Sequence, residues 1–389
     1  MNPSAKGWLK KLLQTLDQYS NPNDIIDLED FYPKLKSVGF IYGSNITVAN
    51  SIFINTDFTQ AERCKVNLIL AMLKVYKEAE NKIESFEQTL KSFYKNIGFY
   101  NRSFIEEFLG EDVELIIHKR IQIDSNVITK NFNSSLTNAL LFMDVLAFSV
   151  FLKNSDYALN YLKKIEHSIR AVVSEALNSK STKNKYDKSL IRLLESSLRL
   201  SDSKNTSFDA LQAVEYSEIE RWYFLDLACM ATWSDLKIDK GEREFFNKLK
   251  KKFEFSNHQI KEAILSVDHF YKENKNDVEL LSTKNLVERF YNNSGKLVKK
   301  LITRNSKRLY QELKESKELL VLLSQSTVRD LTDEEIDKMQ EQLLDVLKSI
   351  PSLAIFMLPG GAILLPLFIK FIPKLLPSAF DDNRIKDKS

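Results

Sequence analysis

Residues 349–369 read SIPSLAIFMLPGGAILLPLFI, and this apolar run lies near the end of an otherwise highly charged chain. None of its residues carries a charge, although 28% of the whole chain is charged. As an α-helix with a rise of roughly 1.5 Å per residue, the run would be about 30 Å long, which is the thickness of the hydrocarbon core of a bilayer. We therefore predict a membrane-type segment here.

Helix-breaking residues interrupt this segment. A proline inside a helix costs about 3 kcal/mol in water, whereas membrane proteins tolerate such breaks where neighbouring groups satisfy the freed carbonyls. Three structures fit: a broken transmembrane helix, a hairpin that enters the membrane and returns, or a buried apolar core. The residues that would shape the segment are Pro351, Pro359, Gly360, Gly361, Pro366, Pro373 and Pro377.

The rest of the chain has the composition of a helical protein. It has 389 residues, 43% of them hydrophobic, and only 9 Gly and 8 Pro, so we predict an all-α fold with long helices. The net charge of +3 is too small to indicate a nucleic-acid partner by itself, and we expect no binding to DNA. The two cysteines favour a reducing compartment over a disulfide scaffold. The N-terminus lacks the apolar core of a signal peptide, so the bulk of the chain is expected in the cytosol.

Apolar residues recur at helical spacing along most of the chain. We predict helices at about 7–19, 59–76, 84–97, 111–123, 136–151, 157–178, 190–200, 219–233, 242–253, 256–265, 296–317 and 332–347. The short runs 40–42 and 52–54 fit either strands or loop anchors. Residues 136–151 are too few for a span, which favours a buried core helix. The basic helix at 7–19 is expected to dock on the protein, with membrane contact as the alternative.

The polar linker 201–207 is a candidate domain boundary. We expect a helical N-terminal domain at 1–200, a second helical domain at 208–290, a C-terminal region at 295–380 and a polar tail at 381–389. The acidic loop 234–242 between two helices resembles the TerB-like helical domain, and this resemblance implies a metal role for Asp235, Asp239 and Glu242. From the residues themselves, Asp239 and Glu242 are expected to cap the following helix.

Two oppositely charged helices are predicted before the apolar end. Residues 296–317 combine an apolar stripe of leucines with an excess of basic side chains, including Lys296, Lys299, Lys300, Arg304, Lys307 and Arg308. This pattern fits contact with anionic lipid, contact with ribosomal RNA or a solvated helix face. Thr332 and Glu335 form a capping box that opens an acidic helix, which we expect to pair with the basic one.

The C-terminal motifs resemble the Letm family of the mitochondrial inner membrane, the leucine-zipper, EF-hand-containing transmembrane proteins. The residues that carry this resemblance are 331–335, 345–351, 364–366 and above all 371–380, FIPKLLPSAF. The whole chain looks like the bacterial Letm-related, biofilm-associated proteins. This resemblance implies a location at the cytoplasmic membrane and a role in biofilm or cell-surface physiology.

Two departures from the mitochondrial pattern affect what the resemblance implies. That pattern has an acidic residue before Leu-Leu-Pro, where this chain has Ala362, and an intramembrane carboxylate is the natural site for cation or proton exchange. The ribosome-binding domain of the mitochondrial family lies beyond the Pro-Ser-x-Phe motif, and this chain ends nine residues after Phe380.

No enzyme motif is found, so we expect no catalytic activity, no cofactor and no confident metal site. His118, His167, His258 and His269 are expected to be surface or packing residues. Our first hypothesis is a non-catalytic, membrane-associated helical protein. The alternatives are ribosome binding through 296–317, and cation–proton exchange or its assembly, linked to ion homeostasis. Exchange through one broken segment would require a homo-oligomer.

Overall fold

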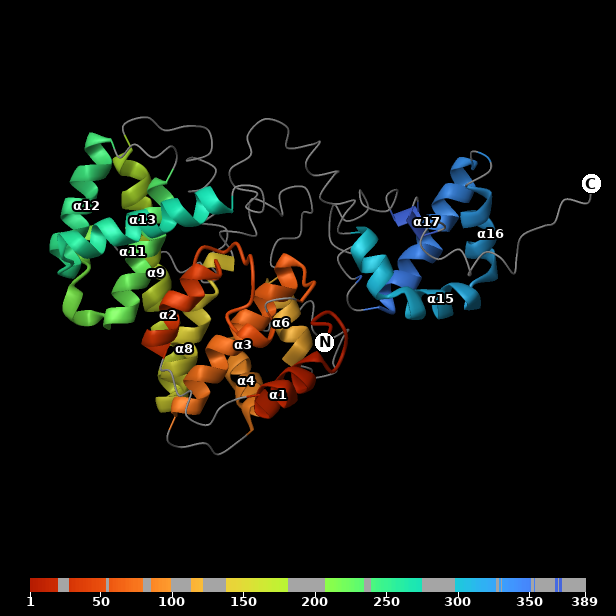
Figure 1. Cartoon of the computed structure of the whole chain (residues 1–389), viewed down its shortest axis with the longest axis horizontal. Coiled ribbons are helices and arrows are strands. Elements are labelled where there is room, and N and C mark those ends of the chain that lie inside the picture. The colour runs from red at the N-terminus through yellow and green to blue at the C-terminus, as the bar shows by residue number, and fades with distance from the viewer. Residues whose placement is uncertain are drawn as a thin grey trace, which may run out of the picture. The chain divides into compact units, whose positions relative to one another are not determined.

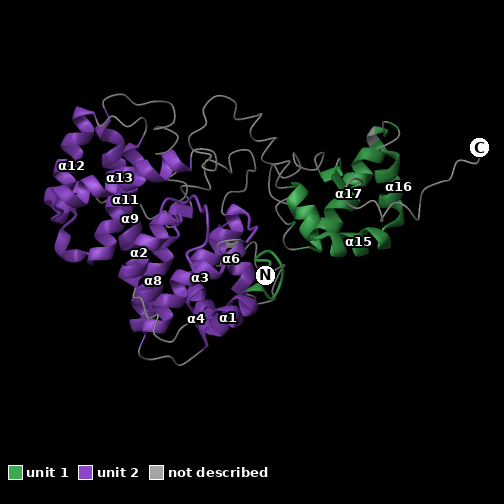
Figure 2. Cartoon of the chain, in the orientation of Figure 1, with its two compact units in different colours: residues 1–8, 124–131, 282–389 green, residues 9–123, 132–281 purple. Residues whose placement is uncertain are grey.

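The computed structural model is all-α in the part of the chain that it describes, as the composition predicted. The described residues are 1–19, 28–53, 56–79, 85–98, 113–121, 138–180, 207–233, 239–274, 298–326, 329, 331–350, 353, 368–369 and 371–372. The chain divides into two compact units, coloured separately in Figure 2. Unit 1 comprises Met1–Trp8, Asp124–Asn131 and Ser282–Ser389, and unit 2 comprises Leu9–Ile123 and Phe132–Leu281.

Most helices lie in unit 2 (Figure 1). In chain order its elements are α1 (Trp8–Tyr19), α2 (Leu28–Ser37), α3 (Gln60–Glu78), α4 (Phe86–Asn96), α6 (Val113–Ile121), α8 (Phe142–Lys153), α9 (Ala158–Ser179), α11 (Glu218–Thr232), α12 (Lys240–Phe253) and α13 (Asn257–Glu273), with short 3₁₀ turns at Ser51–Phe53, Ser155–Tyr157, Phe208–Ala210 and Ala213–Glu215. These helices confirm most of the ranges expected from periodicity. The run 40–42 is a buried turn rather than a strand, and the expected helix 190–200 lies outside the described residues.

Helix α8 forms the centre of unit 2. Every residue of Phe142–Phe148 is buried, and α8 packs against α3 on one side and α9 on another. This arrangement confirms the prediction of a buried core helix at 136–151. Helix α9 in turn packs against α11 and α12, so helices on both sides of the linker 201–207 belong to one compact unit.

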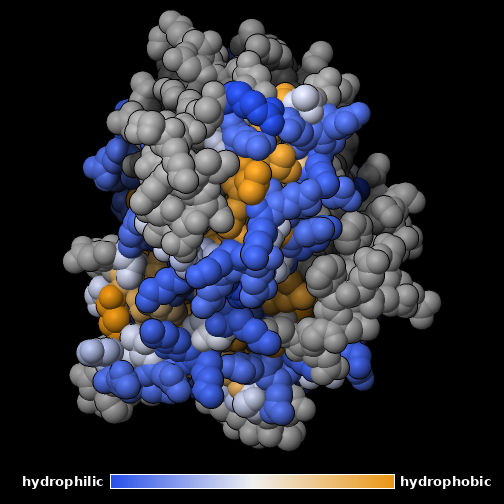
Figure 3. Space-filling view, turned by 90° about the vertical axis from the view of Figure 1, so that its right-hand side faces the viewer, coloured by the Kyte–Doolittle hydropathy of each residue, from blue (hydrophilic) through white to orange (hydrophobic). Residues whose placement is uncertain are grey.

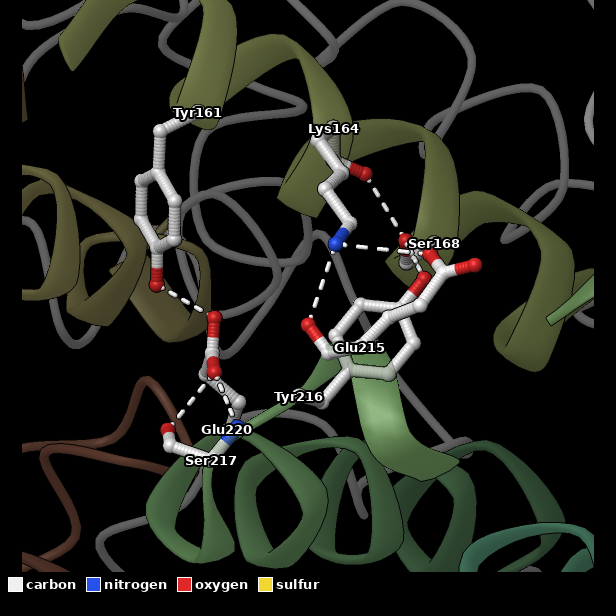
Figure 4. Close-up of polar contacts among 7 residues, drawn as sticks. All are labelled: Tyr161, Lys164, Ser168, Glu215, Tyr216, Ser217 and Glu220. Atoms are coloured by element: carbon white, nitrogen blue, oxygen red, sulfur yellow. Dashed lines mark hydrogen bonds and ion pairs between the residues drawn. The ribbon is translucent and has the colours of Figure 1, made fainter. Parts of the chain in front are cut away.

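Polar side chains fasten α9 to the start of α11 (Figure 4). The Tyr161 hydroxyl donates to the Glu220 carboxylate at 2.5 Å, and the Lys164 ammonium donates to the Glu215 carbonyl at 3.0 Å. The hydroxyls of Ser168 and Tyr216 lie 2.8 Å apart. Glu220 also accepts a hydrogen bond from the Ser217 backbone, because it is the third residue of the capping box of α11. One carboxylate thus caps a helix and joins it to its neighbour.

Unit 1 is built on α15 (Ser306–Glu315), α16 (Lys317–Gln325) and α17 (Asp333–Lys348), each of which contacts the other two. Their leucines form a core of their own with helical residues 298–304. Ile350, Leu353, Phe368 and Ile372 belong to the same core. The helices of unit 1 are amphipathic, so this shared core buries their apolar faces and leaves their charged faces in solvent.

Candidate functional site

The basic stretch of unit 1 is not the single helix that the sequence predicted. It is helical at 298–304, breaks at Asn305, continues as α15 and ends at Ser316. The Asn305 side-chain amide donates to the Leu301 carbonyl at 2.7 Å. Asparagine favours such local hydrogen bonds to the backbone over a regular helix, which accounts for a break that apolar periodicity does not reveal. The prediction of one continuous helix over 296–317 was wrong.

Each of the two helical segments has an apolar face and, on its opposite side, a basic face. Val298, Leu301, Ile302, Leu309 and Leu313 are all 5% exposed or less. The basic residues of the same stretch lie on the outside: Lys299, Lys307, Arg308, Lys314 and Lys317 are exposed, while Lys300 and Arg304 are partly exposed. We refer to these seven residues as the basic surface. Lys296 lies outside the described residues.

On the face drawn in Figure 3, hydrophilic residues make up most of the coloured surface, and hydrophobic residues show in patches between them.

Two members of the basic surface contact the apolar C-terminal part of unit 1. The Lys299 ammonium lies 4.6 Å from the ring centroid of Phe371, a cation–π distance. The Arg308 guanidinium donates to the Ser349 carbonyl at 2.6 Å. Lys307, Lys314 and Lys317 extend into solvent on α15 and at the start of α16. These three lysines can therefore meet a partner while the core of unit 1 stays intact.

The acidic helix α17 begins as the sequence predicted. The Thr332 hydroxyl accepts from the Glu335 amide, and the Glu335 carboxylate accepts from the Thr332 amide. Arg329 donates two hydrogen bonds to Glu335, and these bonds lower the pKa of that carboxyl to about 2.

The expected pairing of a basic helix with an acidic α17 takes a different form. Helix α16 supplies the acid and α17 the base, because Lys338 forms an ion pair with Glu318 at 2.5 Å. Buried leucines from α15, α16 and α17 supply the main contact between the helices.

The acidic residues considered for a metal serve as helix caps. The Asp239 carboxylate accepts from the Glu242 amide at 2.8 Å, and the Glu242 carboxylate accepts from the Asp239 amide at 2.9 Å, which confirms the predicted capping box. Asp235 lies outside the described residues. Within the part of the chain that the structure describes, no group of three or more His, Cys, Asp or Glu side chains is placed to hold a metal ion.

Only the ends of the predicted membrane segment belong to the described residues. Ile350, Leu353 and Phe368 are each 1% exposed or less and pack in the core of unit 1. Pro351, Pro359, Gly360, Gly361, Pro366, Pro373 and Pro377 lie outside the described residues. Among the helices that are described, none has both the length and the apolar character needed for a membrane crossing.

A cavity of about 580 Å³ in unit 2 was not predicted. It lies between α2, the turn after it, α11 and α13. At its wall, Asp226 of α11 forms an ion pair with Lys36 at 2.9 Å and accepts a hydrogen bond from the Tyr32 hydroxyl at 2.8 Å. His258 and His269, predicted as surface or packing residues, lie on its α13 side. No sequence pattern signals this site, because Tyr32 and Asp226 are 194 residues apart.

Comparison with known proteins identifies one matching region. Residues 331–389 match a family described as LETM1-like, RBD, where RBD stands for ribosome-binding domain. This match supports the Letm relationship of the C-terminal region. Because it includes 371–380, the expectation that the ribosome-binding domain lies beyond the Pro-Ser-x-Phe motif was wrong. No curated protein and no solved structure matches the chain.

Proposed function

We propose that this chain is a non-catalytic helical protein whose unit 1 binds the ribosome through the basic surface. The proposal rests on the two opposite faces of 298–317, because its leucines are buried and its lysines face solvent. The adjacent region, 331–389, resembles a family described by ribosome binding. In this proposal the leucine core holds the basic helices rigidly, and α17 forms part of the support.

Ribosomal RNA is the partner that such a surface suits. Lysine and arginine neutralise backbone phosphates and release bound counterions, so affinity falls steeply as salt rises. A lysine acts as a point charge and reads no sequence. The proposal therefore predicts binding that depends on charge and position rather than on a base sequence.

Reversing three exposed charges should weaken ribosome binding. In the variant Lys307→Glu/Lys314→Glu/Lys317→Glu, each substituted side chain is exposed, so the fold of unit 1 is retained. Co-sedimentation with ribosomes over a series of salt concentrations gives the association constant K, and hence the slope of log K against the logarithm of the salt concentration. We expect the slope to fall in magnitude by about 3, or about 1 for each phosphate that the variant no longer neutralises.

The matched control reverses three exposed lysines of unit 2, in Lys95→Glu/Lys251→Glu/Lys261→Glu. This control changes the net charge equally, so it should keep the wild-type slope if the contact is local. Equal weakening in both variants would mean that net charge alone drives sedimentation. Unchanged sedimentation of the first variant would rule out the basic surface.

Membrane attachment is the second candidate function, and the uncharged run 349–369 favours it. In this proposal the run inserts into the cytoplasmic membrane and the rest of the chain stays in the cytosol. Fractionation tests it: the protein should sediment with membranes and resist extraction with alkaline carbonate. Recovery of the chain in the soluble fraction without detergent would eliminate this candidate.

The further roles implied by the Letm resemblance have less support from the residues. Cation–proton exchange needs a carboxylate inside the membrane, and the position where the mitochondrial pattern has one is Ala362. A role in biofilm or cell-surface physiology rests on the resemblance to bacterial Letm-related proteins alone.

A further inference from the structure

We infer that the cavity between α2, α11 and α13 of unit 2 binds a small linear polyamine. This site is separate from the basic surface and attracts the opposite charge. The inference rests on the cavity's aromatic walls, its surplus of carboxylates and a buried hydroxyl that lacks a hydrogen-bond partner among the described residues.

The walls of the cavity are rich in aromatic rings. Tyr32 and Tyr42 are 2% and 1% exposed, and Trp222 and Phe270 line the same space. The ring centroids of Tyr32 and Trp222 are 6.1 Å apart, and those of Tyr42 and Phe270 are 5.0 Å apart. Aromatic faces attract cations, and the methylene groups of a polyamine pack well on them.

The charges around the cavity are mostly negative. Asp226, Glu262 and Glu273 supply three carboxylates, and Lys36 supplies one ammonium. His258 and His269 lie 3.9 Å and 3.1 Å from the carboxylates of Glu262 and Glu273. Three carboxylates against one ammonium favour a cationic ligand over an anionic one.

Asp226 is the buried end of this acidic set. Its side chain is 2% exposed, and burial raises the pKa of its carboxyl while the Lys36 ammonium acts in the opposite direction. Lys36 itself is 21% exposed at the cavity. A second ammonium near this carboxylate would offset the remaining cost of burying its charge.

Tyr42 supplies an acceptor for the ligand. Its side chain lines the cavity, and its buried hydroxyl oxygen has no hydrogen-bond partner among the described residues. Buried polar groups are nearly always hydrogen-bonded in native proteins, so such a group marks a place where a partner is expected. An amine N–H of the ligand would satisfy it.

The spacing of the carboxylates on α13 favours an extended ligand. Glu262 and Glu273 are separated by three helical turns, which corresponds to about 16 Å along the helix axis. Both are exposed, and both belong to the stretch of α13 that lines the cavity. A chain with several ammonium groups can reach more than one of these carboxylates, whereas a compact monoamine reaches one.

Calorimetric titration of the full chain with spermidine tests the inference. We expect saturable 1:1 binding, weakened at least about tenfold in Glu262→Gln/Glu273→Gln and several-fold in Tyr42→Phe, which keeps the ring and removes only the hydroxyl. The matched control, Glu244→Gln/Glu254→Gln, removes two exposed acids of unit 2 that do not line the cavity, so it should bind like the wild type.

Several outcomes would overturn the inference. One is equal weakening in the control, which would indicate general charge attraction. Another is unchanged affinity in both cavity variants. Tighter binding of inorganic phosphate than of spermidine would show that the cavity binds anions through Lys36. Equal displacement of spermidine by Mg²⁺ at the same concentration of charge would show that the aromatic rings contribute nothing to the affinity.

Discussion

Replacing Arg120 by Met should lower the free energy of unfolding of unit 2 by about 3–5 kcal/mol. The Arg120 guanidinium donates two hydrogen bonds to the Asp144 carboxylate, at 2.7 and 3.1 Å, and the two side chains are 1% and 0% exposed. The Tyr94 hydroxyl donates to the same carboxylate at 3.2 Å. Methionine fills similar space but leaves a buried carboxylate without its counter-charge. Urea unfolding followed by circular dichroism measures the change.

Two variants separate the effect of charge from that of packing. The double variant Arg120→Met/Asp144→Asn removes both charges and keeps an acceptor for Tyr94, so it should be more stable than Arg120→Met alone. Lys248→Met breaks an exposed ion pair with Glu175 in the same unit and should cost under about 1 kcal/mol. A double variant as unstable as the sum of its single substitutions would show that packing dominates.

The effect of Arg120→Met should also depend on pH. Burial raises the pKa of Asp144 to about 6 although Arg120 lowers it, so the folded state binds this proton more tightly than the unfolded state does. The contribution of Asp144 to stability is therefore largest below the ordinary carboxyl pKa and declines as pH rises toward 6. Without Arg120 the decline extends to higher pH. The destabilisation should accordingly grow between pH 6 and 8.

The features predicted correctly from the sequence are local ones. The capping boxes at Asp239 and Thr332 are both present, because a cap and its partner are three residues apart and need no tertiary information. Helix positions followed from apolar periodicity for the same reason.

The unpredicted features join distant parts of the chain. Arg120 and Asp144 come from α6 and α8, and Tyr32 and Asp226 come from α2 and α11. A charged residue inside an apolar run indicates that it needs an ion-pair or hydrogen-bond partner, but the run does not show which residue that partner is. The packing of α9 against α11 and α12 is a feature of the same kind, since the polar linker at 201–207 carries no sign of it.

For the apolar end of the chain, composition alone does not determine whether the environment is a membrane or a protein core. The run 349–369 matches a bilayer in length. Yet Ile350, Leu353 and Phe368 at its two ends pack with the leucines of amphipathic helices. Hydropathy measures preference for an apolar environment, and both lipid and a protein core satisfy it.

Replacing Gly39 by Ala should destabilise unit 2 by about 3 kcal/mol, from backbone strain and overpacking together. Gly39 follows α2 with φ of +82°, a left-handed conformation that ends a helix. A Cβ at this position would lie 2.1 Å from the Ser44 carbonyl oxygen and 2.4 Å from Cζ of Phe270. The Ser44 oxygen belongs to the backbone of the same turn, so the turn itself must shift. Urea unfolding measures the decrease in stability.

Gly98 provides the matched control. It also has a left-handed backbone, with φ of +67°, but a Cβ there would meet no atom of the described residues within 4 Å. Gly98→Ala should therefore carry only the conformational cost of about 1–2 kcal/mol. The difference between the two variants isolates the steric contribution at Gly39, and equal destabilisation would refute it.

In Gly39→Ala/Phe270→Leu the ring contact is removed while the Ser44 contact stays, so stability should recover only in part. The Gly39 turn leads directly into Tyr42 at the cavity wall, so a shift of this turn should also weaken spermidine binding, whereas Gly98→Ala should leave it unchanged.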